Sequence, residues 1–93
     1  MFPVHQARPR AHLATFCFSV HADNDVSVLP NVTAALAKRH LIPERMIATR
    51  FSHGEGELHV DFQLDGLDQR AAELLAQALR RMVCARVVLT AEK

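Results

Sequence analysis

Aromatic residues other than phenylalanine are missing from this chain. The 93 residues include no tryptophan and no tyrosine, and all five aromatic residues are phenylalanines. Proteins that bind single-stranded nucleic acid stack its bases on exposed aromatic rings, so this chain is poorly supplied for that function. An excess of basic charge is missing too, because 11 Lys and Arg residues face 10 Asp and Glu residues. With a formal net charge of only +1, the chain lacks the basic balance of a nucleic-acid-binding protein, and we expect no nucleic-acid partner.

Cysteine is scarce, and no long apolar run occurs. Cys17 and Cys84 lie far apart and form no CxxC motif. Two cysteines are too few for the disulfide scaffold of a small secreted protein, so we expect structural, reduced thiols. Both fall in predicted strands, where Cys17 can adjoin Cys84. Nothing approaches the roughly 18 apolar residues of a membrane span, and no secretory apolar region follows the first residues. These absences predict a cytoplasmic protein without a membrane partner.

Length and composition indicate one small domain. A typical domain has about 100–200 residues. An apolar fraction of 49% and a charged fraction of 23% are ordinary for a globular protein. Residues 1–11 carry prolines and arginines without any hydrophobic period, so we predict a flexible N-terminal arm there. A single domain is expected over residues 12–93.

The hydrophobic period changes along the domain in a regular order. Residues 13–21 alternate apolar and small polar side chains, which predicts a half-buried strand. Apolar residues then recur at helical spacing and predict a helix from near Ser27 to near His40, capped by Asp25 or Ser27. The remaining predicted elements are a strand over 46–52, a hairpin turn at 53–56, a strand over 57–64, a helix over 69–82 capped by Asp68, and a strand over 84–92.

This order predicts an α+β fold of the ferredoxin-like type. Two right-handed β-α-β units give a βαββαβ plait, a four-stranded antiparallel sheet with two helices on one face. The second helix is expected to bury Ala71, Leu74, Leu75, Ala78, Leu79 and Met82. The uncovered face of the sheet is expected to be polar and free of a large apolar patch, with Thr15, Cys17, Ser19, Glu57, His59, Asp61 and Gln63. Edge strands or helices can recruit a second copy, so we expect a homodimer.

The turn before the first helix is a candidate binding site. Free N–H groups and a positive dipole end at a helix N-terminus can hold a carboxylate or a phosphate. Asn24 and the amides of Ser27 and Val28 would be the donors. The alternative is that Asp25 or Ser27 caps the helix and occupies those donors itself.

A second polar cluster surrounds the predicted hairpin. His53, Glu57, His59 and Asp61 include imidazole and carboxylate groups, the ligands that many metal sites use. The alternative is the ordinary solvated face of a strand, and the sequence leaves metal binding open. No nucleophile elbow, P-loop, GxGxxG or HExxH motif occurs, so we expect neither a catalytic residue nor a cofactor.

The chain resembles the ACT domain family. FSVHADNDVSVLPNVTAALAKRHLIPERM is similar to the opening of an ACT domain, in which a strand and an acidic or Asn-containing turn lead into a helix. The residues from Asp25 to Leu29 occupy the positions of the family's D-P-G-x-L motif, with Ser27 in place of its glycine. GEGELHVDFQLDGLDQRAAELLAQALRRMVCARVVL is similar to the second half, so the resemblance covers about residues 12–91.

The resemblance implies a regulatory module that binds amino acids between subunits. It places ligand contacts at Asn24, Asp25, Ser27, Val28 and Leu29 and partner contacts on the first helix. A stand-alone chain of this kind resembles the short regulatory subunits of acetohydroxyacid synthase, which bind a separate catalytic subunit. Two functions stay open: an amino-acid-binding regulator of amino-acid metabolism, or an interaction subunit of a metabolic enzyme that binds no small ligand.

Overall fold

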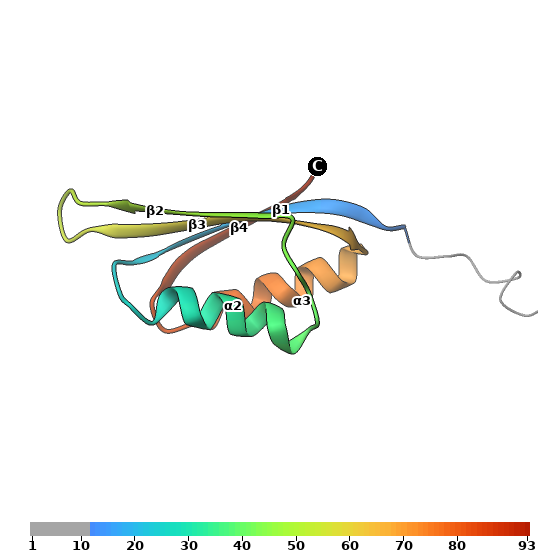
Figure 1. Ribbon diagram of the computed structural model, residues 1–93, viewed down its shortest axis with the longest axis horizontal. Coiled ribbons are helices and arrows are strands. Elements are labelled where there is room, and N and C mark those ends of the chain that lie inside the picture. Colours follow the sequence, from blue (N-terminus) through green and yellow to red (C-terminus); the bar gives the residue numbers. More distant parts are fainter. Residues whose placement is uncertain (1–11) are drawn as a thin grey trace, which may run out of the picture.

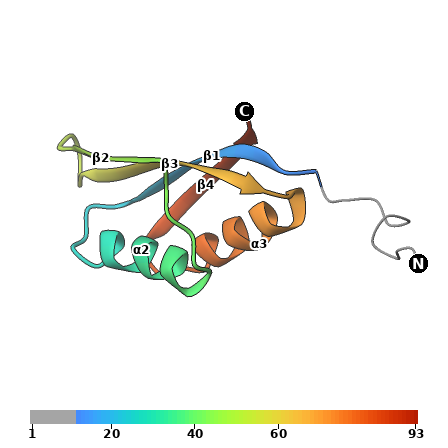
Figure 2. The ribbon, with the colours of Figure 1, turned by 45° about the vertical axis from the view of Figure 1, so that its right-hand side comes forward.

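Four strands and two helices form a two-layered fold. The computed structural model describes residues 12–93, and the expected N-terminal arm at 1–11 lies outside this range. The elements are β1 (Ala14–Asp23), α2 (Val28–Lys38), β2 (Arg45–Phe51), β3 (Glu57–Leu67), α3 (Gln69–Arg80) and β4 (Ala85–Glu92). The strands make one antiparallel sheet in the order β2-β3-β1-β4, and both helices cover the same face (Figure 1 and Figure 2). The predicted ferredoxin-like plait is confirmed.

Apolar side chains of the two central strands meet under the helices. Phe18 lies opposite Phe62 in the register of β1 and β3, and their stacked rings have centroids 5.1 Å apart. Val20 lies opposite Val60, and both are fully buried. Burying a side chain of this size contributes roughly 1.5–3 kcal/mol. The alternation predicted for these strands therefore places the core between the sheet and the helices.

α3 turns a different stripe toward the sheet than the sequence pattern predicts. Leu75 and Leu79 are buried as expected, but Leu74 is 45% exposed. Ala72 and Ala76, which the prediction left out, are buried instead. Leucines and alanines cover more than half of this helix, so the sheet selects among several apolar arcs. The small alanine side chains allow close approach to the strands.

The ends of both helices follow recognisable capping patterns. Asp68 Oδ1 accepts a hydrogen bond of 2.7 Å from the Ala71 N–H, which confirms the predicted cap of α3. After α2 and its C-cap residue Arg39, His40 adopts the left-handed region at φ 56°. The N–H of Leu41 then donates to the carbonyl of Leu36 at 3.0 Å, which closes the helix in the manner of a Schellman motif.

The face of the sheet turned away from the helices, called the open face below, is not uniformly polar. The central strands present polar side chains there, as expected, including Ser19 and Asp61. The edge strands add apolar ones: Ile47 pairs with Asp61 and is 50% exposed, and Leu89 pairs with Ser19 and is 54% exposed. Phe51 and Val87 extend these two edges. The expected polar face is confirmed for the central strands, but the edge strands, which the prediction did not consider, add apolar side chains.

The two cysteines do not adjoin. Cys17 lies opposite Ala91, toward the end of β4. Cys84 lies beside the other end of β1, where its carbonyl accepts a hydrogen bond of 2.9 Å from the Asp23 N–H. Both thiols are free. The antiparallel pairing of β1 with β4 separates them, so the expectation of neighbouring cysteines is wrong.

Candidate functional site

The turn between β1 and α2 is closed by its own acidic residue. Asp25 Oδ1 accepts hydrogen bonds from the Ser27 N–H at 2.8 Å and from the Ser27 hydroxyl at 2.6 Å. The N–H of Val28 donates to the backbone carbonyl of Asp25 at 3.2 Å. Both amides named above as ligand donors are therefore bonded within the turn. Asp25, rather than the side chain of Ser27, occupies them.

These contacts also fix the charge that the turn presents. The hydrogen bond from the Ser27 hydroxyl, followed by the bond from the Ser27 N–H, lowers the pKa of Asp25 below its ordinary value. The Asp25 carboxylate is exposed, so the turn offers a stable negative charge to solvent. What this turn can bind directly at Asp25 is a cation such as an ammonium group, rather than an anion.

One backbone donor of the first turn of α2 stays outside these bonds. Pro30 has no N–H, and the N–H of Asn31 donates to the Ser27 carbonyl at 3.1 Å. The N–H of Leu29 is the donor that none of them uses. Beside it, Val26 is 95% exposed, so the outer side of the turn is open.

The β2–β3 hairpin lies against the same turn. Gly56 is buried at φ +88°, and a Cβ atom there would lie 3.2 Å from Asn24 Nδ2 and 3.3 Å from the Phe51 carbonyl oxygen. This spacing is tighter than ordinary van der Waals contact. The φ angle favours glycine here, and a Cβ atom would in addition crowd the Asn24 side chain and the Phe51 carbonyl.

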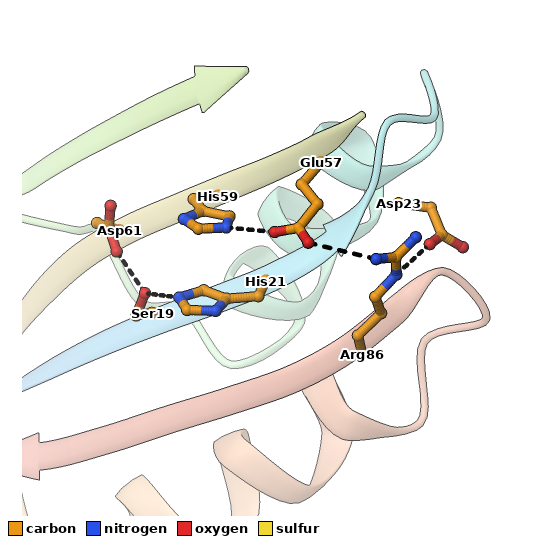
Figure 3. A network of polar contacts seen from close by, with 7 residues as sticks. All are labelled: Ser19, His21, Asp23, Glu57, His59, Asp61 and Arg86. Atoms are coloured by element: carbon orange, nitrogen blue, oxygen red, sulfur yellow. Dashed lines mark hydrogen bonds and ion pairs between the residues drawn. The ribbon is translucent and has the colours of Figure 1, made fainter. Parts of the chain in front are cut away.

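Beside this turn, a chain of polar contacts crosses the open face (Figure 3). Ser19 Oγ donates to Asp61 Oδ1 at 2.5 Å and lies 3.0 Å from His21 Nε2. The ring of His21 stacks on the ring of His59, and His59 Nε2 lies 2.8 Å from Glu57 Oε1. Because the Ser19 hydroxyl gives its proton to Asp61, it accepts from His21, whose Nε2 therefore carries hydrogen.

Arg86 joins the far end of this network to β4. Its Nε donates to Asp23 Oδ1 at 2.5 Å, and its Nη1 donates to Glu57 Oε2 at 3.4 Å. The hydrogen bond with His59, and secondarily the charge of Arg86, lowers the pKa of Glu57. The hydrogen bond with Asp23 and its charge raise the pKa of Arg86. The network thus links the two central strands to one edge strand.

The arrangement of these groups gives no support to a metal site. His59 Nε2 is engaged by Glu57 and Asp61 by Ser19, so these side chains do not converge. Over residues 12–93, no three His, Cys, Asp or Glu side chains are grouped to hold a metal ion, and His53 joins no such group.

Ser19, His21 and Asp61 are the residue types of a hydrolytic triad in the wrong connectivity. Nucleophilic catalysis needs a serine that gives its proton to a histidine base. Here the serine proton points to the carboxylate, and the histidine donates to the serine. In this arrangement the three side chains form a hydrogen-bonded network across β1 and β3 and are not connected in the order of a triad.

A groove lies beyond Ser19 at the other end of the open face, and we call it the open-face groove. Its volume is about 390 Å³, and its lining includes Cys17, Ser19, Arg45, Ile47, Asp61 and Leu89. Sequence reasoning missed it because the groove depends on the pairing of strands far apart in the chain. The signal was the pair of apolar edge residues, Ile47 and Leu89.

Comparison with known proteins identifies the family. A family model described as an ACT-like domain matches residues 8–92. The chain belongs to the ACT-like domain family. ACT domains are regulatory modules that often bind amino acids, which agrees with the expected regulatory role.

No curated protein sequence matches the chain at a significant level. Within the described residues, no helix of this ACT-like domain is long and apolar enough to cross a membrane.

Solved structures share the fold at low sequence identity. The ACT domain of the GTP pyrophosphokinase of Chlorobium tepidum is 9% identical with a TM-score of 0.72, and the match covers 86% of this chain and 100% of that chain. An uncharacterised protein from Thermotoga maritima is 12% identical with a TM-score of 0.71, over 87% and 98% of the two chains. The regulatory subunit of aspartate kinase from Thermus flavus is 14% identical with a TM-score of 0.62, over 87% and 53%.

Proposed function

We propose that this ACT-like protein is a non-catalytic cytoplasmic regulator that binds an amino acid at the β1–α2 turn of a homo-oligomer and so controls an enzyme of amino-acid metabolism. The observation that carries the proposal is the exposed Asp25 carboxylate, held in place by two hydrogen bonds from Ser27. A fixed, charged acceptor of this kind suits the ammonium group that every amino acid carries.

The neighbouring residues can serve the other end of the same ligand. The N–H of Leu29 and the side-chain amide of Asn24 are donors suited to a carboxylate. Ser27 and Val28 shape the turn through their bonds to Asp25. The ligand-binding set is therefore Asn24, Asp25, Ser27, Val28 and Leu29, with Asp25 as acceptor and the amides of Asn24 and Leu29 as donors.

A second copy of the chain would complete this site. Binding sites usually bury most of a small ligand, and one copy leaves the outer side of the turn open at Val26. An amino acid bound between two turns would be enclosed from both sides. This supports a homodimer in which the ligand is shared between the subunits.

A second candidate function is an interaction subunit of a metabolic enzyme that binds no small ligand. The bonds from Ser27 and Val28 to Asp25 favour it, because the turn already satisfies the amides that an anionic group would use. In that case the domain would act on a catalytic subunit by contact alone.

Thermal unfolding against a panel of amino acids separates the two candidates. An amino acid at about 100 times its Kd adds about 2.7 kcal/mol, which raises Tm by about 10 °C or more for a domain of this size. A selective rise supports the amino-acid regulator, and a flat panel for the folded protein supports the interaction subunit. Asn24→Ala should abolish the rise without loss of folding, whereas Asn31→Ala on the exposed side of α2 should keep it. A rise that survives Asn24→Ala would place the ligand elsewhere.

A further inference from the structure

The open-face groove has the shape and chemistry of a second ligand site, separate from the turn. We propose that it binds a small monocarboxylate with an apolar body, such as an aromatic or branched alkyl acid. Its volume of about 390 Å³ lies within the roughly 300–1,000 Å³ of known ligand sites.

The walls of the groove come from the two edge strands. Ile47, Asp61, Ser19 and Leu89 form one row across the sheet, with the apolar residues at its ends. At about 4.8 Å per strand, the backbones of Ile47 and Leu89 lie roughly 14 Å apart. An aromatic ring or branched chain fits flat between these half-exposed side chains and removes apolar surface of both from water.

Two polar side chains on the floor of the groove, Ser19 and Gln63, already have hydrogen-bond partners. Ser19 donates to Asp61. The Gln63 amide donates to Glu44 Oε1 at 2.8 Å, and its oxygen accepts from Lys93 Nζ at 3.3 Å. An apolar body can therefore cover Ser19 and Gln63 without breaking their hydrogen bonds.

Arg45 sets the charge of the ligand and its orientation. It lies on β2 two residues before Ile47, on the same face of the sheet, and it pairs with Gln63. Among residues 12–93 its guanidinium makes neither a hydrogen bond nor an ion pair, although it lines the groove. A planar carboxylate matches the paired donors of a guanidinium. The negative charge of Asp61 keeps the carboxylate at the Arg45 end and disfavours a dianion.

The two free cysteines provide an internal control for the test. Cys17 lines the groove and Cys84 lies outside it, beside Asp23 at the opposite end of β1. The probe is 3-phenylpropanoate, and its uncharged counterpart is 3-phenylpropanamide. Iodoacetamide alkylation of each cysteine is followed by mass spectrometry with either probe present. At about ten times its Kd, the acid should slow alkylation of Cys17 by about tenfold and leave Cys84 unchanged, since only the empty groove reacts.

Variants decide whether Arg45 and Leu89 cause this protection. Arg45→Gln should raise the Kd for the acid by about tenfold or more. Arg50→Gln is its matched control, because Arg50 lies on the same strand but on the opposite face. Leu89→Ala should weaken the binding of both probes, whereas Leu74→Ala on α3 should leave the binding of both unchanged. Loss of binding in a control variant alone would contradict the assignment.

Other outcomes would overturn the proposal. Equal protection by acid and amide would show that Arg45 does not distinguish the charged probe from the uncharged one. Equal protection of Cys17 and Cys84 would show binding outside the groove. Alkylation of Cys17 that slows with protein concentration and ignores the probe would show that a second copy fills the groove. Asn24→Ala should retain the protection, which separates failure of this proposal from failure of the turn site.

Discussion

The imidazole rings of His21 and His59 lie parallel on the two central strands, with their centroids 3.9 Å apart and their planes 5° apart. The two residues face each other directly in the register of β1 and β3. His21 contacts Ser19 on its own strand, and His59 contacts Glu57 on its own strand. The stack therefore joins two short polar chains into one network, and its acidic end at Glu57 gives the first prediction.

Replacing Glu57 by Gln should remove an acid-sensitive part of the stability. The His59 hydrogen bond and the Arg86 charge lower the pKa of Glu57 in the folded protein, so the unfolded chain takes up its proton at higher pH. The contribution is present above about pH 4.5 and is lost as pH falls through the lower folded pKa. Urea unfolding should show that the advantage of wild type over Glu57→Gln is constant near neutral pH and shrinks as the pH falls below about 4.5. Glu73→Gln on α3 is the control, and a pH-independent difference for Glu57→Gln would refute the argument.

Replacing Val60 by Asp should prevent cooperative folding. Val60 is fully buried between the sheet and the helices, and an unpaired carboxylate there costs several kcal/mol. Far-ultraviolet circular dichroism during heating is the measurement. Ile47→Asp, at a half-exposed position of the neighbouring strand, should remain folded. A soluble Val60→Asp protein with a cooperative transition would show that the assigned strand face is incorrect.

Replacing Asp68 by Ala should destabilise α3 at its N-terminus. The carboxylate satisfies the Ala71 N–H at 2.7 Å, and loss of such a cap costs about 1 kcal/mol. Urea denaturation at neutral pH measures the change in the free energy of unfolding. Asp65→Ala, on the exposed side of β3, removes a similar charge without a cap and should have a much smaller effect. Equal losses in both variants would mean that general charge, rather than capping, matters.

Replacing His40 by Gly should stabilise the protein. His40 follows the C-cap residue Arg39 of α2 and holds φ 56°, a conformation that costs a residue with a Cβ atom about 1 kcal/mol and costs glycine little. The free energy of unfolding should therefore rise by up to about 1 kcal/mol. Arg39→Gly, one residue earlier at φ −102°, should lower it because glycine there only adds freedom to the unfolded chain. Changes of the same sign in the two variants would contradict this explanation.

The orientation of β1 and β3 could be predicted from the sequence because only one face of each strand is apolar. Val60 and Phe62 alternate with polar residues, so one face of β3 can only point inward. α3 is different, because an arc through Leu74 looks as apolar as the arc through Ala72 and Ala76 that the sheet selects. Where several faces of an element are apolar, packing against the neighbouring layer decides which face is buried.

The candidate sites were less predictable than the fold. The sequence offered both a ligand and Asp25 for the amides of the turn, and the choice depends on the rotamer of one side chain. The open-face groove requires Ile47 and Leu89 to lie in one row. Their strands, β2 and β4, are separated in the chain by β3 and α3, and no local pattern records that arrangement.

The close approach of Gly56 to Asn24 brings the β2–β3 hairpin into direct contact with the β1–α2 turn. The Asn24 side chain is otherwise exposed, so its contact with Gly56 is the point where the turn and the hairpin touch. The hairpin leads back into β2, which is an edge strand with one side open to pairing. A ligand that moves Asn24 would therefore act directly beside the hairpin that leads into this edge strand.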